Sequence, residues 1–143
     1  MMDGNAELLN FVYQNSQMGV DTLDQLSTIV KDQEFKDYLK KQYEGYLDFH
    51  KEAREKLLES GHDEKGLSAF EKIKTYLMVN MQTLTDQSTS HIAQMLITGS
   101  SMGVTDAIKK EKEYKDARKD ILALMEKLRK YEEKNIEKLK EFL

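Results

Sequence analysis

The sequence predicts an all-α protein built as a four-helix bundle, and three observations support this prediction. The chain of 143 residues contains no proline, so very long helices are permitted. Apolar residues recur at steps of three and four, whereas the period-two runs typical of strands are missing. Between Thr75 and Thr105 the only charged residue is Asp86, yet more than half of the residues from Asp106 to Leu143 are charged. Because a helix that faces water needs a polar face, the uncharged stretch predicts a covered helix.

The first helix is predicted from about Ala6 to Val30, and Asp3, Gly4 or Asn5 could cap its start. Its apolar residues cover a wide arc, so we expect burial on more than one side. They are Leu8, Leu9, Phe11, Val12, Met18, Leu23, Leu26, Ile29 and Val30.

The second helix is predicted from about Glu34 to Glu59, because its apolar and aromatic residues share one face. These residues are Leu39, Tyr43, Tyr46, His50, Ala53 and Leu57. Ser60 and Gly61 form a good stop, since glycine readily adopts the left-handed conformation that ends many helices. A polar loop is expected to follow.

The middle of the chain is predicted to contain a connector helix and then a break. Ser68 and Glu71 have the spacing of a capping box, so a helix should begin there. Thr85 to Ser88 is rich in turn formers, which predicts a break before the next helix. The last helix has a clear apolar stripe, made of Ala117, Ile121, Leu124, Leu128 and Tyr131 and widened by Leu122, Met125 and Ile136.

A weak internal repeat suggests how these helices are arranged. Gln17–Val20 resembles Ser101–Val104, and the apolar positions upstream of the two segments agree. Further along, Glu34–Asp37 resembles Glu113–Asp116. We interpret these matches as a duplicated helical hairpin.

The duplication predicts one domain, residues 1–143, made of a hairpin at 6–60, a crossover at 61–87 with its own short helix, and a hairpin at 88–142. Gly99 and Gly103 would then lie inside a helix. The alternative is that Gly99 to Gly103 forms an ordinary loop. The helix from Ser68 would in that case be one long third helix of an up-down-up-down bundle.

Two hairpins joined by a long crossover resemble the ferritin-like superfamily. The segment from Gly61 to Gly66, the connector helix and the stretch from Gly99 to Ile108 look similar to small, uncharacterised bacterial ferritin-like proteins. The resemblance implies a di-iron centre, with one Glu from each of two helices and a Glu-x-x-His pair from each of the other two.

The sequence does not supply that ligand set. Glu59 and His62 have the required spacing, but they straddle a helix end. Aligning the two hairpins by their repeat places Arg129 opposite His50 and Glu126 opposite Leu47. The remaining glutamates should lie near Ser16 or Gln17 and near Ser100 or Ser101, where no residue is acidic. We therefore expect no acidic residue at the bundle centre, no resident metal and no other cofactor.

The function predicted from these features is a non-catalytic, protein-binding or structural role. The uncharged stretch is consistent with burial inside the chain or with a surface for self-association, most simply as a homodimer, or for another protein. Small residues at this place would allow close approach of helices. The candidates for the interface are Met95, Gly99, Met102 and Gly103.

The alternative function is a ferritin-like oxidoreductase or iron-binding protein with a non-standard site holding iron or manganese. Its candidate ligands are Glu44, Asp48, His50 and Glu126, with Asp21 or Glu111 as further possibilities. Against this alternative, we interpret His50 as a hydrogen-bonded core histidine. We interpret Glu126 and Arg129 as a surface pair.

Composition argues against several other classes of function. The net charge of −4 disfavours nucleic acid as the main partner. No segment has the apolar length of a membrane span, and the N-terminus does not resemble a secretory signal. The chain contains no cysteine, which excludes a thiolate metal site and suits a cytoplasmic protein.

Overall fold

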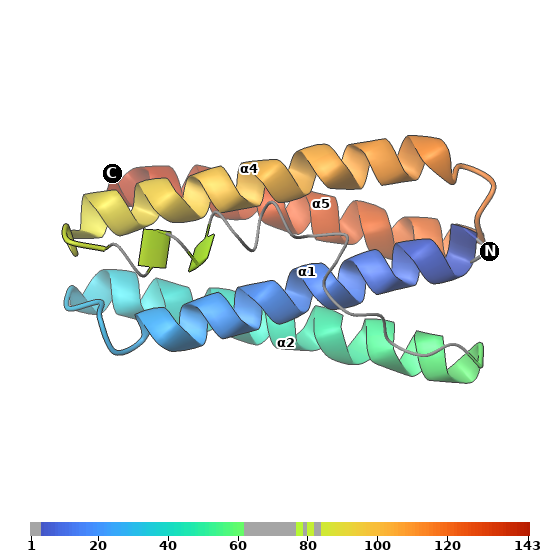
Figure 1. Cartoon of the computed structure of the whole chain (residues 1–143), viewed down its shortest axis with the longest axis horizontal. Helices are drawn as coiled ribbons and strands as arrows, with labels where there is room; N and C mark the ends of the chain where they lie inside the picture. The colour runs from blue at the N-terminus through green and yellow to red at the C-terminus, as the bar shows by residue number, and fades with distance from the viewer. Residues whose placement is uncertain (1–3, 62–76, 79, 82–83) are drawn as a thin grey trace.

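The protein consists of four long helices packed as two hairpins, and a computed structural model describes residues 4–61, 77–78, 80–81 and 84–143. Figure 1 shows the two hairpins lying along each other. The elements are α1 (Gly4–Leu26), α2 (Gln33–Glu59), α4 (Thr89–Glu113), α5 (Lys119–Leu139) and the short 3₁₀-helix η2 (Lys140–Phe142). Helix α1 packs on α2, and α4 packs on α5.

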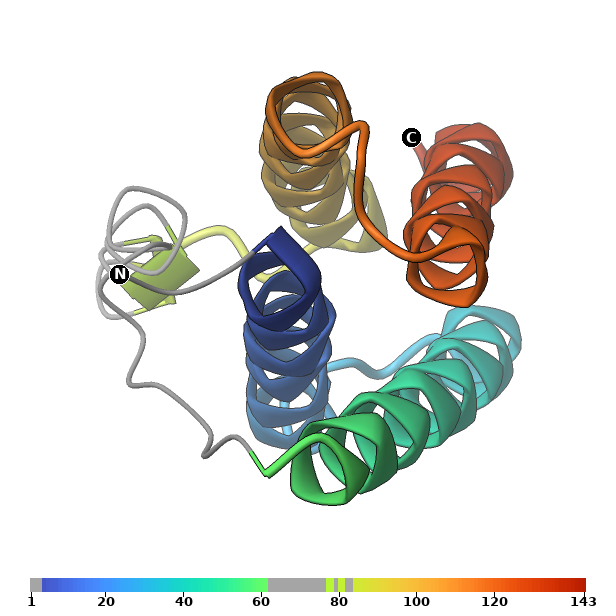
Figure 2. The same cartoon turned by 90° about the vertical axis from the view of Figure 1, so that its right-hand side faces the viewer.

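The connection between the hairpins is a long crossover, because α2 and α4 run in the same direction (Figure 1). Seen end-on, the four helices surround a shared interior (Figure 2). Residues 84–88 carry no helix, so the chain breaks where the sequence predicted. The alternative of one long third helix that ends near Gly99 is therefore wrong.

Helix α1 ends at Leu26, four residues before the predicted end at Val30. The reason is local hydrogen bonding. The hydroxyls of Ser27 and Thr28 donate to the backbone oxygens of Asp24 and Gln25, at 2.6 and 3.1 Å. These bonds satisfy carbonyls that the last turn of a helix leaves without partners.

The ends of α2 follow ordinary capping chemistry. Asp32 Oδ2 accepts a hydrogen bond from the backbone N–H of Phe35 at 2.9 Å, which fixes the start of the helix. After Glu59 the chain leaves the helix through Gly61, whose φ of 72° lies in the left-handed region. The predicted stop at Ser60 and Gly61 is confirmed.

Helix α4 begins after Ser88, whose hydroxyl accepts a hydrogen bond from the N–H of His91 at 3.2 Å. The helix continues to Glu113, so Gly99 and Gly103 lie inside it, as the duplication predicted.

The alignment of the second helices of the two hairpins is different from the predicted one. Glu34–Asp37 belongs to the first turns of α2, but Glu113–Asp116 lies at the end of α4 and in the turn after it. The pattern of burial pairs Tyr46 with Glu132 instead. The same constant separation pairs Phe35 with Ile121, Leu39 with Met125, Gln42 with Leu128, Phe49 with Asn135 and Ala53 with Leu139.

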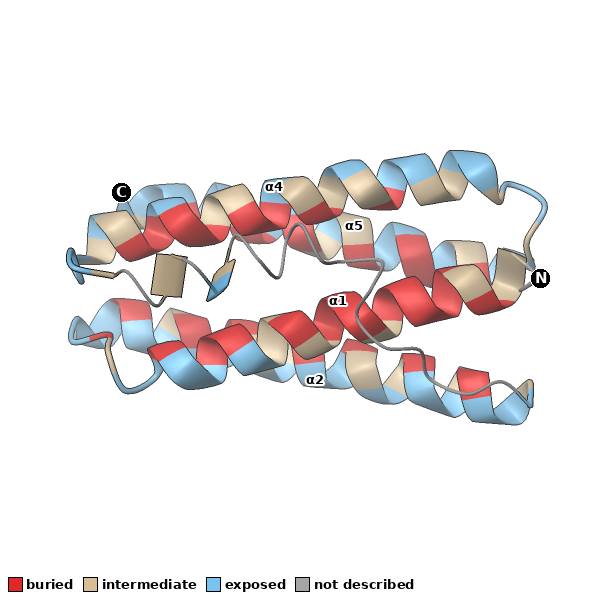
Figure 3. Ribbon diagram, viewed as in Figure 1, coloured by how far each residue is buried: buried red, intermediate tan, exposed pale blue. Residues whose placement is uncertain are grey.

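The interior contains two apolar clusters, one toward each end of the bundle. The buried sides of the helices face one another in Figure 3, and α1 is buried along most of its length. Leu77 belongs to the segment before α4 and packs against both clusters. It lies over Gly99, where an added Cβ would come within 3.1 Å of Leu77 Cδ2. Leu77 and the two clusters therefore cover part of the uncharged stretch within the chain, whereas Met78, Gln94 and Ser101 are exposed.

The connector helix is described only in part. The capping box at Ser68 and Glu71 lies outside the described residues. The described residues 77–78 and 80–81 of the connector are helical.

Among the helices of the described part, none combines the length and apolar character that a bilayer crossing requires.

Candidate functional site

The most unusual feature of the bundle is a cluster of polar side chains at mid-height in its core. Glu132 of α5 is only 5% exposed, and Gln42 of α2 is 3% exposed. Asn15 of α1 and Asn135 of α5 are similarly buried, and so is Tyr46 of α2. Because isolated polar groups are costly to bury, such a cluster must be held by hydrogen bonds.

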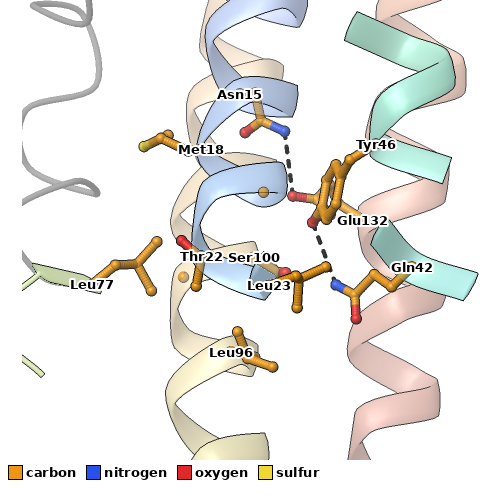
Figure 4. Close-up of a pocket in the computed structure, with 12 residues that line it drawn as sticks. Asn15, Met18, Thr22, Leu23, Gln42, Tyr46, Leu77, Leu96, Ser100 and Glu132 are labelled. Carbon is orange, nitrogen blue, oxygen red and sulfur yellow. Dashed lines mark hydrogen bonds between the residues drawn. The ribbon is translucent and has the colours of Figure 1, made fainter. Parts of the chain in front are cut away.

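The carboxyl group of Glu132 is the centre of this network. Its Oε1 accepts hydrogen bonds from the hydroxyl of Tyr46 and from Nδ2 of Asn135, the latter at 3.3 Å. Its Oε2 accepts from Nδ2 of Asn15 at 3.4 Å. Gln42 Nε2 in turn donates to the Tyr46 hydroxyl at 3.4 Å. Three of the four helices thus meet at one carboxyl group (Figure 4).

Burial governs the electrostatics of the network. Desolvation raises the pKa of Glu132 above its ordinary value, although the hydrogen bonds from Tyr46, Asn135 and Asn15 act in the opposite direction. Desolvation, followed by the nearby charge of Glu132, raises the pKa of Tyr46 well above its ordinary value. Both groups therefore favour their neutral forms.

Two further tyrosines tie the network to the surrounding helices. The hydroxyl of Tyr38 donates to Asn135 Oδ1 at 2.9 Å. The hydroxyl of Tyr131 donates to the backbone oxygen of Gln42 at 2.6 Å. These two bonds and the Tyr46 bond connect α2 to α5 by side chains with high rigidity, since each tyrosine has only two side-chain torsions.

Glycines in α1 and α4 make room for these polar groups. A Cβ added at Gly19 would lie 2.5 Å from the ring of Tyr46. One added at Gly103 would lie 3.0 Å from Asn15 Oδ1 and 3.5 Å from Glu132 Oε2. Gly19 and Gly103 therefore allow close packing within the chain.

A small cavity adjoins the network and has a volume of about 40 Å³. Figure 4 shows its lining, in which Leu77 lies on one side of α4 and the Glu132 network on the other. Its lining includes residues with polar side chains, which are Asn15, Thr22, Gln42, Tyr46, Ser100 and Glu132. The apolar part comes from Met18, Leu23, Leu77 and Leu96, and Gly19 and Gly99 complete the lining.

The metal-ligand candidates from the sequence do not gather at this centre. Glu44, Asp48 and Glu126 are exposed, and so is Asp21. His50 is half-buried, and its ring centre lies 4.4 Å from that of Tyr13. In the described part of the chain, no three His, Asp or Glu residues come together as a possible metal site.

Glu126 and Arg129, predicted to pair with each other, each have other partners. Glu126 pairs with Lys130 at 3.0 Å, one turn further along the helix. Arg129 instead pairs with Glu111 of α4 at 3.2 Å and with Glu133 at 2.8 Å. Glu111 is therefore part of a contact between helices at the bundle surface.

The interface candidates are mostly covered by the chain itself. Met95 is 2% exposed, Gly99 and Gly103 are buried, and Met102 is half-buried. In this fold Met95, Gly99 and Gly103 are buried residues of α4, and Met102 lies partly at its surface.

Glu132 is the residue that the sequence interpretation missed, and its burial contradicts the expectation of a centre without acidic groups. With Asn135 it forms Glu-x-x-Asn, which has the spacing of Glu-x-x-His with an amide in place of the imidazole. The neighbouring positions on the other three helices carry Tyr46, Asn15 and Gly103. One carboxyl group among amides and a phenol does not fit a di-iron pair, which needs four carboxylates and two histidines.

Comparison with known protein families, curated proteins and solved structures gives no match. The class that is established is an all-α four-helix bundle with two hairpins and a long crossover. Membership of the ferritin-like superfamily has no support beyond this arrangement of helices.

Proposed function

We propose that this protein is a non-catalytic helical-bundle module, ferritin-like in its arrangement, that binds protein or plays a structural role. The observation that carries the proposal is the state of Glu132. Its carboxyl group already accepts three hydrogen bonds, and burial favours its neutral form. A metal pair needs several charged carboxylates with free lone pairs.

Metal analysis tests this proposal against the alternative of an iron- or manganese-binding oxidoreductase. The protein would be purified without chelator and its metal content measured for the wild type, His50→Ala and Glu132→Gln. We expect far less than one metal ion per chain in all three. Stoichiometric iron or manganese in the wild type, lost in either variant, would establish the alternative instead.

Self-association is the second part of the proposal, and the outer face of α2 is its best candidate surface. Leu47 and Leu58 are 41% and 58% exposed, although both are large and apolar. Their spacing corresponds to about three helical turns, so both side chains point to the same side of α2. A two-fold contact through this face would cover both leucines.

Light scattering after gel filtration tests this second part. We expect a mass twice that of the 16.7 kDa chain, and a monomer when Leu47 and Leu58 are both changed to Glu. Ile108→Glu on α4 is the control, because it places a charge on another face at a site 39% exposed. A monomeric wild type, or a dimer that only the control disrupts, would refute the proposed surface.

A further inference from the structure

Gln42, which lines the cavity beside the Glu132 network, carries an unsatisfied hydrogen-bonding group. Gln42 Oε1 is buried and accepts no hydrogen bond from any described residue, whereas Nε2 of the same amide donates to Tyr46. Exchanging the two ends of the amide would leave an N–H group there instead, so one end lacks a partner in either orientation. Leaving such a group unsatisfied is costly, because no hydrogen bond offsets the water that it loses on burial.

The cavity has the size and the lining that a buried water requires. A water molecule needs a cavity of at least roughly 10–15 Å³ and two to four polar partners. This cavity has a volume of about 40 Å³, and Thr22 and Ser100, which both carry a hydroxyl group, line it together with Gln42. Thr22, Ser100 and Gln42 are each at most 8% exposed, so these partners are built into the core.

We propose that the cavity is an internal hydration site, in which ordered water donates a hydrogen bond to Gln42 Oε1. The hydroxyls of Thr22 and Ser100 supply its further partners. Water fits better than a cation, because the lone carboxyl group of the cavity is engaged by Tyr46, Asn15 and Asn135. Water also fits better than an apolar ligand, which would leave Gln42 unsatisfied.

Oxygen-17 magnetic relaxation dispersion tests the proposal, because it counts water molecules that stay bound longer than the protein tumbles. We expect the amplitude to fall by the contribution of at least one water in Gln42→Leu and in Ser100→Val. The first change removes the acceptor, and the second fills the cavity with a methyl group and removes a hydroxyl. Equal amplitudes in the wild type and both variants would overturn the proposal.

Ser16→Ala is the matched control. Ser16 is fully buried, but its hydroxyl bonds to the backbone oxygens of Val12 and Tyr13 and does not line the cavity. The control should keep the full amplitude, and an equal loss there would count against the proposal.

A measurement on the wild type alone keeps the test independent of variants that fold poorly. Nuclear Overhauser cross-peaks are expected between water and the side-chain amide protons of Gln42. The sign of these cross-peaks should be the one expected for a water molecule that stays bound longer than the protein tumbles. The absence of these peaks would overturn the proposal.

Discussion

Hydrogen-bond donors from three helices hold the carboxyl group of Glu132 in the core. Because the group is buried, its protonation state affects the stability of the fold. The folded protein keeps the carboxyl group protonated to a higher pH than the unfolded chain does, because burial raises its pKa. Between the ordinary carboxyl pKa of 4.5 and the raised value, the folded state binds more protons. The free energy of unfolding therefore falls as the pH rises through this window.

Glu132→Gln should remove this pH dependence, because glutamine is neutral and nearly isosteric. Denaturant unfolding at a series of pH values from 4 upward measures it. As the pH rises through this window, the free energy of unfolding of the variant should increase relative to that of the wild type. The increase should be at most about 1.4 kcal/mol per pH unit.

Glu126→Gln provides the opposite control. The hydrogen bond from Lys130 lowers the pKa of Glu126, so its contribution is present at neutral pH and is lost as the pH falls. A pH dependence that is unchanged in Glu132→Gln would contradict the role assigned to the buried carboxyl group.

Gly19 is a residue at which the fold leaves no room for a side chain. Gly19→Ala would place Cβ 2.5 Å from the ring of Tyr46, which is held by its bond to Glu132. We expect a loss of about 1–3 kcal/mol, as for other overpacked cores. Gly99→Ala is the matched comparison, because its neighbour is the flexible end of Leu77 at 3.1 Å. The midpoint temperature of thermal unfolding should be clearly lower for Gly19→Ala than for Gly99→Ala. The reverse order would contradict this explanation.

At the scale of the elements, the helix ends are determined by side chains that form hydrogen bonds with nearby backbone groups. The start of α2 depends on the bond from the Phe35 N–H to Asp32. Asp32→Ala should cost about 1 kcal/mol in chemical denaturation, whereas Asp32→Asn should cost little because asparagine caps equally well. Equal effects of the two changes would show that charge, and not the cap, determines stability there.

The elements also show what could be predicted from the sequence. The break before Ser88 and the helix through Gly99 and Gly103 were predicted, because turn formers and a repeated apolar pattern are local signals. The end of α1 was misplaced, since hydroxyls at Ser27 and Thr28 satisfy the carbonyls and Ile29 and Val30 still look helical.

The site was missed because Glu132 lies in a charge-rich segment in which an acidic residue is normally exposed, as its neighbour Glu133 is. One signal could have found it. The apolar stripe of α5 steps from Leu128 to Glu132, Asn135 and Leu139 when it is continued at intervals of four and three. Position on the stripe therefore indicated burial, while residue type indicated exposure.

At the scale of the whole molecule, the network makes each hairpin depend on the other. Asn15 and Tyr46 of the first hairpin are partners of Glu132 in the second. Separating the hairpins would expose apolar faces and break these bonds together, so we expect a single cooperative transition.

Tyrosine fluorescence and far-ultraviolet circular dichroism should report the same unfolding midpoint. The seven tyrosines make this measurement possible, since the chain has no tryptophan. Two separated transitions would show that the hairpins unfold independently.

The first turn of α1 also reaches the second hairpin. Asn5 was one of three residues that could cap its own helix, but its Oδ1 accepts a hydrogen bond from the backbone N–H of Arg118 at 2.8 Å, where α5 begins. Arg118 lies at an exposed bend, where a main-chain proton would ordinarily exchange with deuterated solvent almost at once. Its exchange rate therefore serves as a gauge of how often the two halves of the molecule come apart at that end.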